Sequence, residues 1–159
     1  MTQQNLRQPP RGFQAWFSRA PIFFYKIGLG WVFKERFLLL THIGRKSALP
    51  RKAVLEVVDQ NAENYYIVSG FGEKSQWYKN LMYTPQVNIQ IGRKEMTAQA
   101  ERLPAAEALK VLRNYAEAHP KALRELSRLM GVSYDGSKED LEKMAKILPV
   151  LALHIQKKE

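Results

Sequence analysis

Residues 36–59 read RFLLLTHIGRKSALPRKAVLEVVD, and this pattern predicts two strands joined by a tight turn. Residues 36–43 are apolar on both faces, as expected of a strand buried inside a sheet. The sequence GRKS at 44–47 is a turn signal, because glycine permits a sharp bend. Residues 51–59 then predict the returning strand. The whole stretch therefore predicts an antiparallel hairpin with a basic turn.

Outward from this hairpin, the chain continues with strand patterns and one short helix. Residues 65–70 (YYIVSG) predict a third strand after a turn at 60–64. Residues 75–83 predict a helix with Ser75 as its N-cap. In residues 86–91 apolar and polar side chains alternate, the typical pattern of a half-buried strand, and residues 95–103 predict its partner.

The C-terminal third predicts helices inserted before a last strand. Pro104 is placed in the first turn of one helix, which the sequence His-Pro at 119–120 ends. A second helix runs to about Met130, and Gly131 suits its C-terminal cap. Ser137 and Asp140 resemble a capping box for a third helix through Ile147.

These elements predict one domain over residues 1–159, with a mixed or antiparallel barrel of five or six strands. Residues 1–35 are expected to form a helical N-terminal segment. The barrel strands and the short helix occupy 36–103, the helices occupy 104–147, and the last strand occupies 148–156.

Composition narrows the classes of function. The 159 residues carry a formal net charge of +10, and residues 1–60 hold ten basic but only three acidic side chains. A basic field of this kind attracts phosphates, anionic lipid or nucleic acid, although a solvated basic surface explains it equally well. The chain has no cysteine, no apolar run near about 20 residues and no signal-peptide pattern, so we expect a cytoplasmic protein without a metal site.

Two stretches carry the residues most suited to a ligand. Residues 41–52 place four cations and two hydroxyl side chains around the predicted turn, where exposed backbone amides can form an anion-binding nest. Residues 69–81 run from a glycine-rich strand end into a helix start, which also favours anions. Each has an ordinary structural interpretation, a basic hairpin turn in the first and core packing of Trp77 and Tyr78 in the second. The three histidines are interpreted as structural.

Taken together and in this order, the two stretches resemble the deazaflavin-dependent nitroreductase family of the flavin-binding split β-barrel superfamily. The family pattern LLLTTxGRKSGxPR corresponds to LLLTHIGRKSALPR at 38–51, and GxGExSDWYRNLxxNPxVxVxxG corresponds to GFGEKSQWYKNLMYTPQVNIQIG at 70–92. The His-Pro at 119–120 and LPVLAL at 148–153 also fit. Three positions depart from the patterns: Ala48 replaces a glycine, Gln76 an acid and Thr84 an asparagine.

The resemblance implies a split β-barrel of about six strands and a groove for coenzyme F420, a deazaflavin with a phosphate and an oligoglutamate tail. It implies that the phosphate and tail contact the first stretch, and that the ring contacts Ser69, Gly70 and Gly72 through backbone, with Lys74 and Trp77 closing the side of the helix start. The implied cofactor-binding residues are Gly44, Arg45, Lys46, Ser47, Pro50, Arg51, Ser69, Gly70, Gly72, Lys74 and Trp77.

The function implied is an oxidoreductase that transfers hydride from reduced F420 to a nitroaromatic, a quinone or an activated enone; no catalytic residue is identified. Two alternatives stay open: an FMN-binding reductase on the same barrel, and a non-enzymatic cofactor or lipid carrier. The apolar and basic segment 13–34 motivates the carrier and predicts peripheral contact with the inner face of a membrane. A homodimer is a further expectation, and nucleic acid is not expected as a partner, because the aromatic residues do not alternate with the basic ones.

Overall fold

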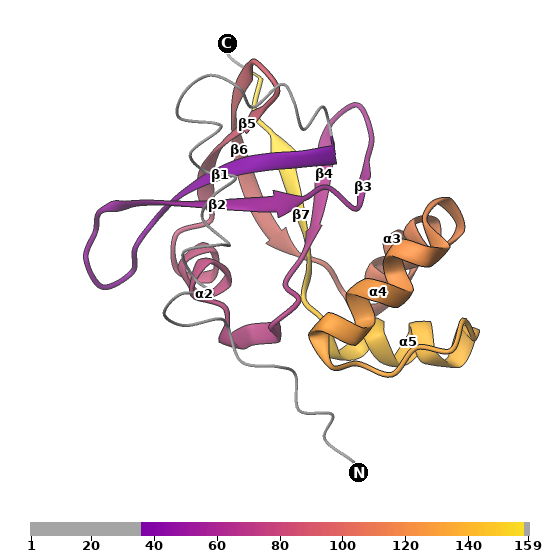
Figure 1. The fold of residues 1–159 in the computed structure, drawn as a ribbon. Helices are drawn as coiled ribbons and strands as arrows, with labels where there is room; N and C mark the ends of the chain where they lie inside the picture. The colour runs from indigo at the N-terminus through magenta and orange to yellow at the C-terminus, as the bar shows by residue number, and fades with distance from the viewer. Residues whose placement is uncertain (1–35, 158–159) are drawn as a thin grey trace.

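The computed structural model describes residues 36–157, apart from the side chains of Leu126 and Leu129, and its centre is one curled antiparallel sheet (Figure 1). The strands are β1 (Phe37–Ile43), β2 (Pro50–Glu56), β3 (Asp59–Gln60), β4 (Asn64–Val68), β5 (Gln86–Ile91), β6 (Lys94–Arg102) and β7 (Val150–Ile155). The helices are the 3-10 turn η2 (Gly72–Lys74), α2 (Gln76–Tyr83), α3 (Ala105–Ala118), α4 (Pro120–Met130) and α5 (Lys138–Ile147). The predicted helical segment 1–35, including 13–34, lies outside the described residues.

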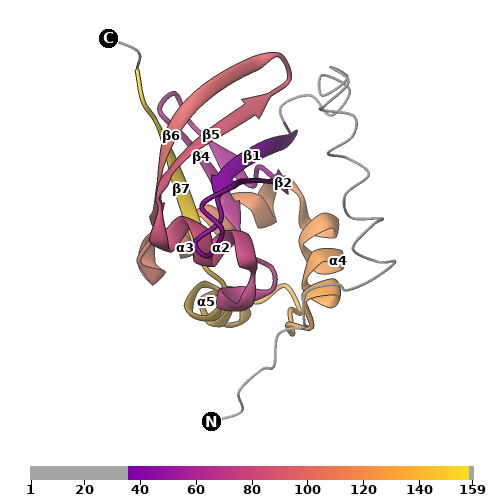
Figure 2. The same ribbon diagram turned by 90° about the vertical axis from the view of Figure 1, so that its left-hand side faces the viewer.

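The sheet has the order β2-β1-β5-β6-β7-β4-β3, and its strands curl into an open half-barrel (Figure 2). The two ends of the sheet meet where β2 passes into β3, because Val57 N–H donates to Arg36 O (2.8 Å) and Val58 N–H donates to Tyr66 O (2.9 Å). The predicted split barrel with helices before its last strand is confirmed.

One strand boundary was predicted wrongly. The strand expected over 51–59 is two strands, because the chain leaves the β1 pairing at Val57 and Val58 to pair with β4. This break adds the two-residue strand β3, so residues 36–157 contain seven strands instead of about six.

The inner face of the barrel is apolar and is covered at one end by α2. The predicted alternation of buried and exposed side chains in β5 is confirmed, since Val87, Ile89 and Ile91 are buried while Gln86 and Asn88 are exposed. Burying each large aliphatic side chain contributes about 1.5–3 kcal/mol. The buried core here consists of Leu38, Leu40, Ile67, Tyr78, Leu81, Val87, Ile89, Ile91, Ala98, Ala100, Leu151 and Leu153.

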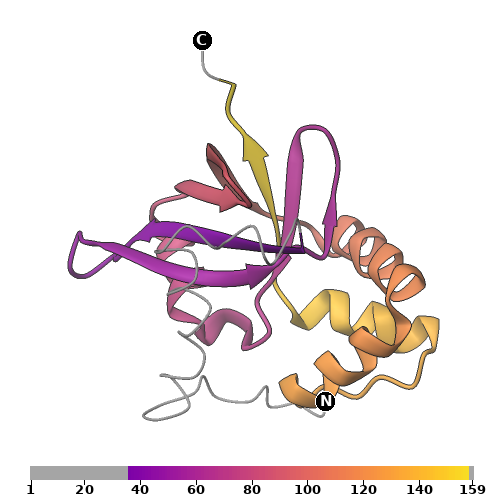
Figure 3. The same ribbon diagram turned by 45° about the horizontal axis from the view of Figure 1, so that its top comes forward.

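Helices α3, α4 and α5 form a second layer with its own core. This layer and the tip of the β1–β2 hairpin lie at opposite ends of the molecule (Figure 3). The predicted caps are confirmed at Gly131, which has the left-handed φ of 75°, and at Ser137, which accepts the N–H of Asp140. Pro104 is the N-cap of α3 instead of a first-turn residue. The core consists of Val58, Ala108, Val111, Leu112, Tyr115, Ala116, Leu123, Met130, Val132, Leu141, Met144, Ala145, Leu148 and Val150.

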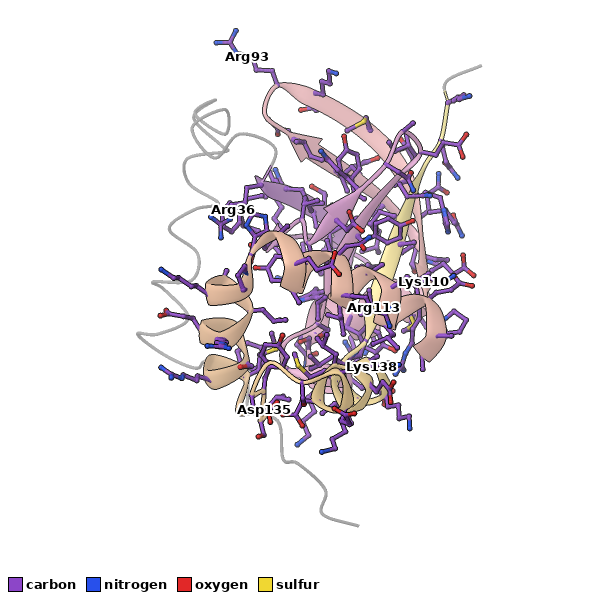
Figure 4. The ribbon with its side chains drawn as sticks, turned by 90° about the vertical axis from the view of Figure 1, so that its right-hand side faces the viewer. Arg36, Arg93, Lys110, Arg113, Asp135 and Lys138 are labelled. Carbon is purple, nitrogen blue, oxygen red and sulfur yellow. The ribbon has the colours of Figure 1, made fainter. Side chains whose placement is uncertain are left out.

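A buried tyrosine joins this helical layer to the sheet. Tyr115 on α3 donates its hydroxyl to Glu56 at the end of β2 (2.9 Å), and Glu56 also pairs with Arg36 (3.2 Å), which Figure 4 labels. Burial, followed by the charge of Glu56, raises the pKa of Tyr115 well above its ordinary value. The Tyr115 hydroxyl is therefore a structural donor at neutral pH.

Candidate functional site

The turn between β1 and β2 is compact and carries most of the predicted ligand-binding residues. Gly44 N–H donates to Leu49 O (2.9 Å), and Ala48 N–H donates to Gly44 O (2.8 Å). A Cβ at position 44 would lie only 2.6 Å from Ser47 Oγ, so a side chain there would displace the Ser47 hydroxyl. Ala48 has a φ of 56°, the conformation that favours glycine, which is the residue usual there in the family pattern.

Three cations on this hairpin are exposed and have no acidic partner. Lys46, Arg51 and Lys52 form no ion pair within the part of the chain that the structure describes. Arg51 Nη2 lies 3.5 Å from Ser47 Oγ, so a guanidinium and a hydroxyl converge beside the close approach at Gly44. We call residues 44–52 the basic hairpin. Pro50, also predicted as a site residue, begins β2 opposite Ile43.

Arg45 has a different position from the other cations of the basic hairpin. Both of its terminal nitrogens donate to Gln76 Oε1 at 3.1 Å, and Nη1 also donates to Asn80 Oδ1 at 3.0 Å. The Arg45 backbone N–H donates to the same Asn80 oxygen at 3.1 Å. Arg45 therefore holds the basic hairpin on α2, and its donors are directed at the helix.

Asn80 is buried and completes this junction through His42. Since Asn80 Oδ1 accepts two N–H groups from Arg45, its Nδ2 must face His42 Nδ1, 3.1 Å away. That nitrogen of His42 then accepts, and the ring proton resides on Nε2. Burial, followed by the nearby charge of Arg51, lowers the pKa of His42 to about 4, so the imidazole is neutral at pH 7.

The second predicted stretch forms a closed turn before α2. Ser69 Oγ lies 2.6 Å from Gly72 O and 2.9 Å from Ser75 Oγ, and Gly72 N–H donates to Ser69 O (3.0 Å). Ser69 N–H donates to Pro149 O (2.9 Å), and the residue has no exposed surface. Gly72 has a φ of 65°, which this turn requires. Ser75 is at the N-cap position, but its hydroxyl makes no cap bond and contacts Ser69 instead, which corrects the predicted cap.

The other predicted residues of this stretch lie on three different surfaces. Gly70 lies against α4, since an added Cβ would be 3.2 Å from Met130 Cγ. Lys74 is exposed at the end of η2. Trp77 is half-buried against the barrel core and makes an edge-on contact with Tyr78, with 6.4 Å between ring centroids.

Tyr78 is part of the core, as the structural interpretation of the two aromatic residues predicted. Its hydroxyl accepts from Arg102 Nη1 (2.9 Å), and Arg102 also pairs with Glu73. This contact fixes the start of α2 to β6 and occupies the one acid of the η2–α2 segment.

The structure thus brings the basic hairpin onto α2 through three residues whose roles the sequence did not reveal: His42, Gln76 and Asn80. Gln76 and Asn80 are separated by one helical turn and so share a face of α2. The spacing of these two polar residues is a signal that could have indicated a polar contact on this face.

A cavity of about 300 Å³ lies on strands β1, β2, β5 and β6. It contains none of the residues that the resemblance implies for the cofactor. Its lining consists of Leu39, Thr41, Lys52, Asn88, Ile89, Gln90, Glu95, Met96 and Thr97.

Within residues 36–157 no three acidic or histidine side chains come together as a metal site would require. No helix in the same range is long and apolar enough to cross a bilayer.

The basic hairpin suits an anionic group. A guanidinium, an ammonium and a hydroxyl are the donors that phosphate and carboxylate groups accept from in proteins. The observation that supports this fit is that Lys46, Arg51 and Lys52 are exposed and form no ion pair within the described residues, on the same hairpin as the Ser47 hydroxyl.

Solved structures share this fold. A structure described as an F420-H2 dependent reductase, FDR-A, matches with a TM-score of 0.55 and 24% identity, covering 76% of this chain and 96% of that chain. One described as a domain-swapped dimer matches with a TM-score of 0.57 and 21% identity, over 90% and 100%. A conserved hypothetical protein from Mycobacterium tuberculosis matches at 0.54 and 17%, over 84% and 80%. No curated protein sequence matches the chain.

These similarities, together with the curled sheet and inserted helices, show that the fold is a split β-barrel. The sequence profile of F420H(2)-dependent quinone reductase matches residues 24–132, and the chain belongs to this family. The protein is therefore an F420-dependent reductase, and F420 is its cofactor. The resemblance found in the sequence is confirmed, and the family favours F420 over FMN.

Proposed function

We propose that this protein transfers hydride from reduced F420 to a quinone, with nitroaromatics and activated enones as further acceptors. When bound, reduced F420 supplies the hydride. Reduction of a quinone to a hydroquinone consumes one hydride, which carries both electrons, and one proton. The hydride would supply the first hydrogen, and a proton from solvent or an acidic group would supply the second. The observation that supports this proposal is the basic hairpin in a chain of this family.

The residues of the basic hairpin have separate roles in this proposal. Lys46, Arg51 and the Ser47 hydroxyl hold the phosphate and the acidic tail, in the compact turn that Gly44 begins. Arg45 keeps the hairpin on α2, as its contacts to Gln76 and Asn80 indicate.

The turn before α2 is proposed to border the deazaflavin ring. Ser69 and Gly72 shape the turn, because their backbone groups bond within it, and Gly70 lets the turn pack closely against Met130 of α4. Lys74 and Trp77 border the helix start. A dry, oriented site is what such a scaffold contributes to hydride transfer.

The test is oxidation of reduced F420 on addition of a soluble quinone. We expect turnover by the wild type and a fall of at least tenfold in kcat/KM for F420 in Lys46→Ala/Arg51→Ala, because two charge-assisted contacts are lost. The matched control is Arg93→Ala, which removes an exposed cation at the β5–β6 tip (Figure 4). Absence of quinone-dependent oxidation by the folded wild type would refute the proposed reaction.

The same assay with a nitroaromatic or an enone in place of the quinone tests the further acceptors. Parallel assays with reduced FMN test the alternative cofactor.

The homodimer and the membrane contact of residues 13–34 stay predictions. Sedimentation velocity can test the first, and vesicle co-sedimentation can test the second.

A further inference from the structure

Arg45 is a fixed cation whose charge is not neutralised. Its guanidinium is held in place by Gln76 Oε1 through two donors and by Asn80 Oδ1 through one. Both partners are neutral amides. Arg45 forms no ion pair in the part of the chain that the structure describes, so its full positive charge stays at the junction of the basic hairpin and α2.

The surroundings of Arg45 add to this charge. The basic hairpin contains no acid, and α2 contains none either. The single acid of the neighbouring η2 turn, Glu73, pairs with Arg102 on β6. His42, which also contacts Asn80, is neutral at pH 7 and contributes no charge.

We propose that Gln76 is a specificity-determining residue, which raises affinity for a polyanionic cofactor tail because it holds Arg45 without cancelling its charge. This inference rests on the proposed binding of F420 at the basic hairpin. A carboxylate at position 76 would hold Arg45 through the same two donors but would remove one unit of positive charge from the site. Gln76 therefore contributes to the field of the site instead of contacting the cofactor.

The exchange of Gln76 for glutamate isolates this effect, because the two side chains have the same shape and Glu Oε1 accepts the same bonds from Arg45. Gln76 is exposed, so the change buries no charge. The change in field acts over a distance comparable with the Debye length, about 8 Å at physiological ionic strength, so low salt reveals it best.

The experiment is a fluorescence titration of wild type and Gln76→Glu with F420 and with the neutral deazaflavin nucleoside that lacks phosphate and tail. We expect Gln76→Glu to weaken F420 binding about three- to tenfold at 20–50 mM salt, with the difference shrinking at 0.5 M salt. Affinity for the neutral nucleoside should change less than twofold. The control Gln156→Glu adds the same charge to an exposed position after β7 and should bind F420 as the wild type does.

Three results would overturn the inference. Equal F420 affinity of wild type and Gln76→Glu at low salt would show that the charge at Arg45 does not matter. Equal weakening for F420 and the neutral nucleoside would show that the substitution acts through geometry. A wild type that does not bind F420 would remove the proposed function itself, which separates that failure from the other two.

Discussion

The junction between the basic hairpin and α2 predicts a large cost for the substitution Asn80→Ala. Asn80 has only 5% of its surface exposed and His42 only 4%, so water replaces the lost partners poorly. The substitution removes one charge-assisted bond, worth about 1.5–3 kcal/mol, and two neutral ones of about 1 kcal/mol each. After a gain of about 0.5 kcal/mol in helix propensity and the retained Arg45–Gln76 contact, we expect a net loss of about 2–4 kcal/mol.

Urea denaturation measures this cost. With a slope of about 2 kcal/mol per molar urea, the midpoint should fall by about 1–2 M at unchanged slope. The matched control is Asn114→Ala in α3, whose exposed amide donates to Asp59 (2.9 Å) and whose loss should cost less than about 0.5 kcal/mol. An Asn80→Ala midpoint equal to that of the control would refute the assignment of Asn80 as the residue that joins the basic hairpin to α2.

A second substitution at this position separates the bond to Arg45 from the bond to His42. In Asn80→Asp the carboxylate still accepts from Arg45, but it cannot donate to His42 Nδ1 and instead favours a proton there. We therefore expect the pKa of His42, followed by NMR, to rise above about 4 in this variant. An unchanged pKa would contradict the bond between Asn80 Nδ2 and His42 Nδ1.

Three further predictions concern stability. The pKa of His42 is lowered in the folded protein to about 4, so its contribution to the free energy of unfolding is present above pH 6.5 and is lost as the pH falls toward 4. The wild type should lose about 1–2 kcal/mol of stability from this group between pH 7 and 5. His42→Gln should flatten that part of the plot of stability, measured by urea denaturation, against pH. Ala48→Gly relieves about 1–2 kcal/mol of left-handed strain against up to about 1 kcal/mol of added chain entropy, so the thermal midpoint should rise, and a fall would contradict the strain. Tyr115→Phe removes the bond to Glu56 and should cost about 1–2 kcal/mol in calorimetry, whereas no loss would show that this bond is not stabilising.

The local features of the fold could be predicted from the sequence because their causes are local. The alternation of residues 86–91, the turn at Gly44 and the caps at Gly131 and Ser137 each depend on neighbours within a few positions. The break between β2 and β3 could not be predicted in this way, since it depends on pairing of Val58 with β4 across the closing barrel.

The candidate site shows the same division. The sequence indicated the cations of the basic hairpin, but the role of Arg45 depends on Gln76 and Asn80, which follow it by 31 and 35 positions. Ser75 was expected to cap α2, and only the folded turn shows its hydroxyl directed at Ser69. Contacts of this kind form when distant segments pack, so no local pattern encodes them.

The most direct test of F420 binding at the basic hairpin is a titration of the wild type, Arg51→Ala and Arg93→Ala with F420. Arg51 lies beside Ser47 and Gly44 in the basic hairpin, whereas Arg93 is an exposed cation at the β5–β6 tip. We expect Arg51→Ala to weaken F420 binding about 10- to 100-fold, the value of one charge-assisted contact, and Arg93→Ala to leave it unchanged. Equal affinities of Arg51→Ala and the wild type, with both proteins folded, would contradict the placement of the F420 phosphate and tail at the basic hairpin.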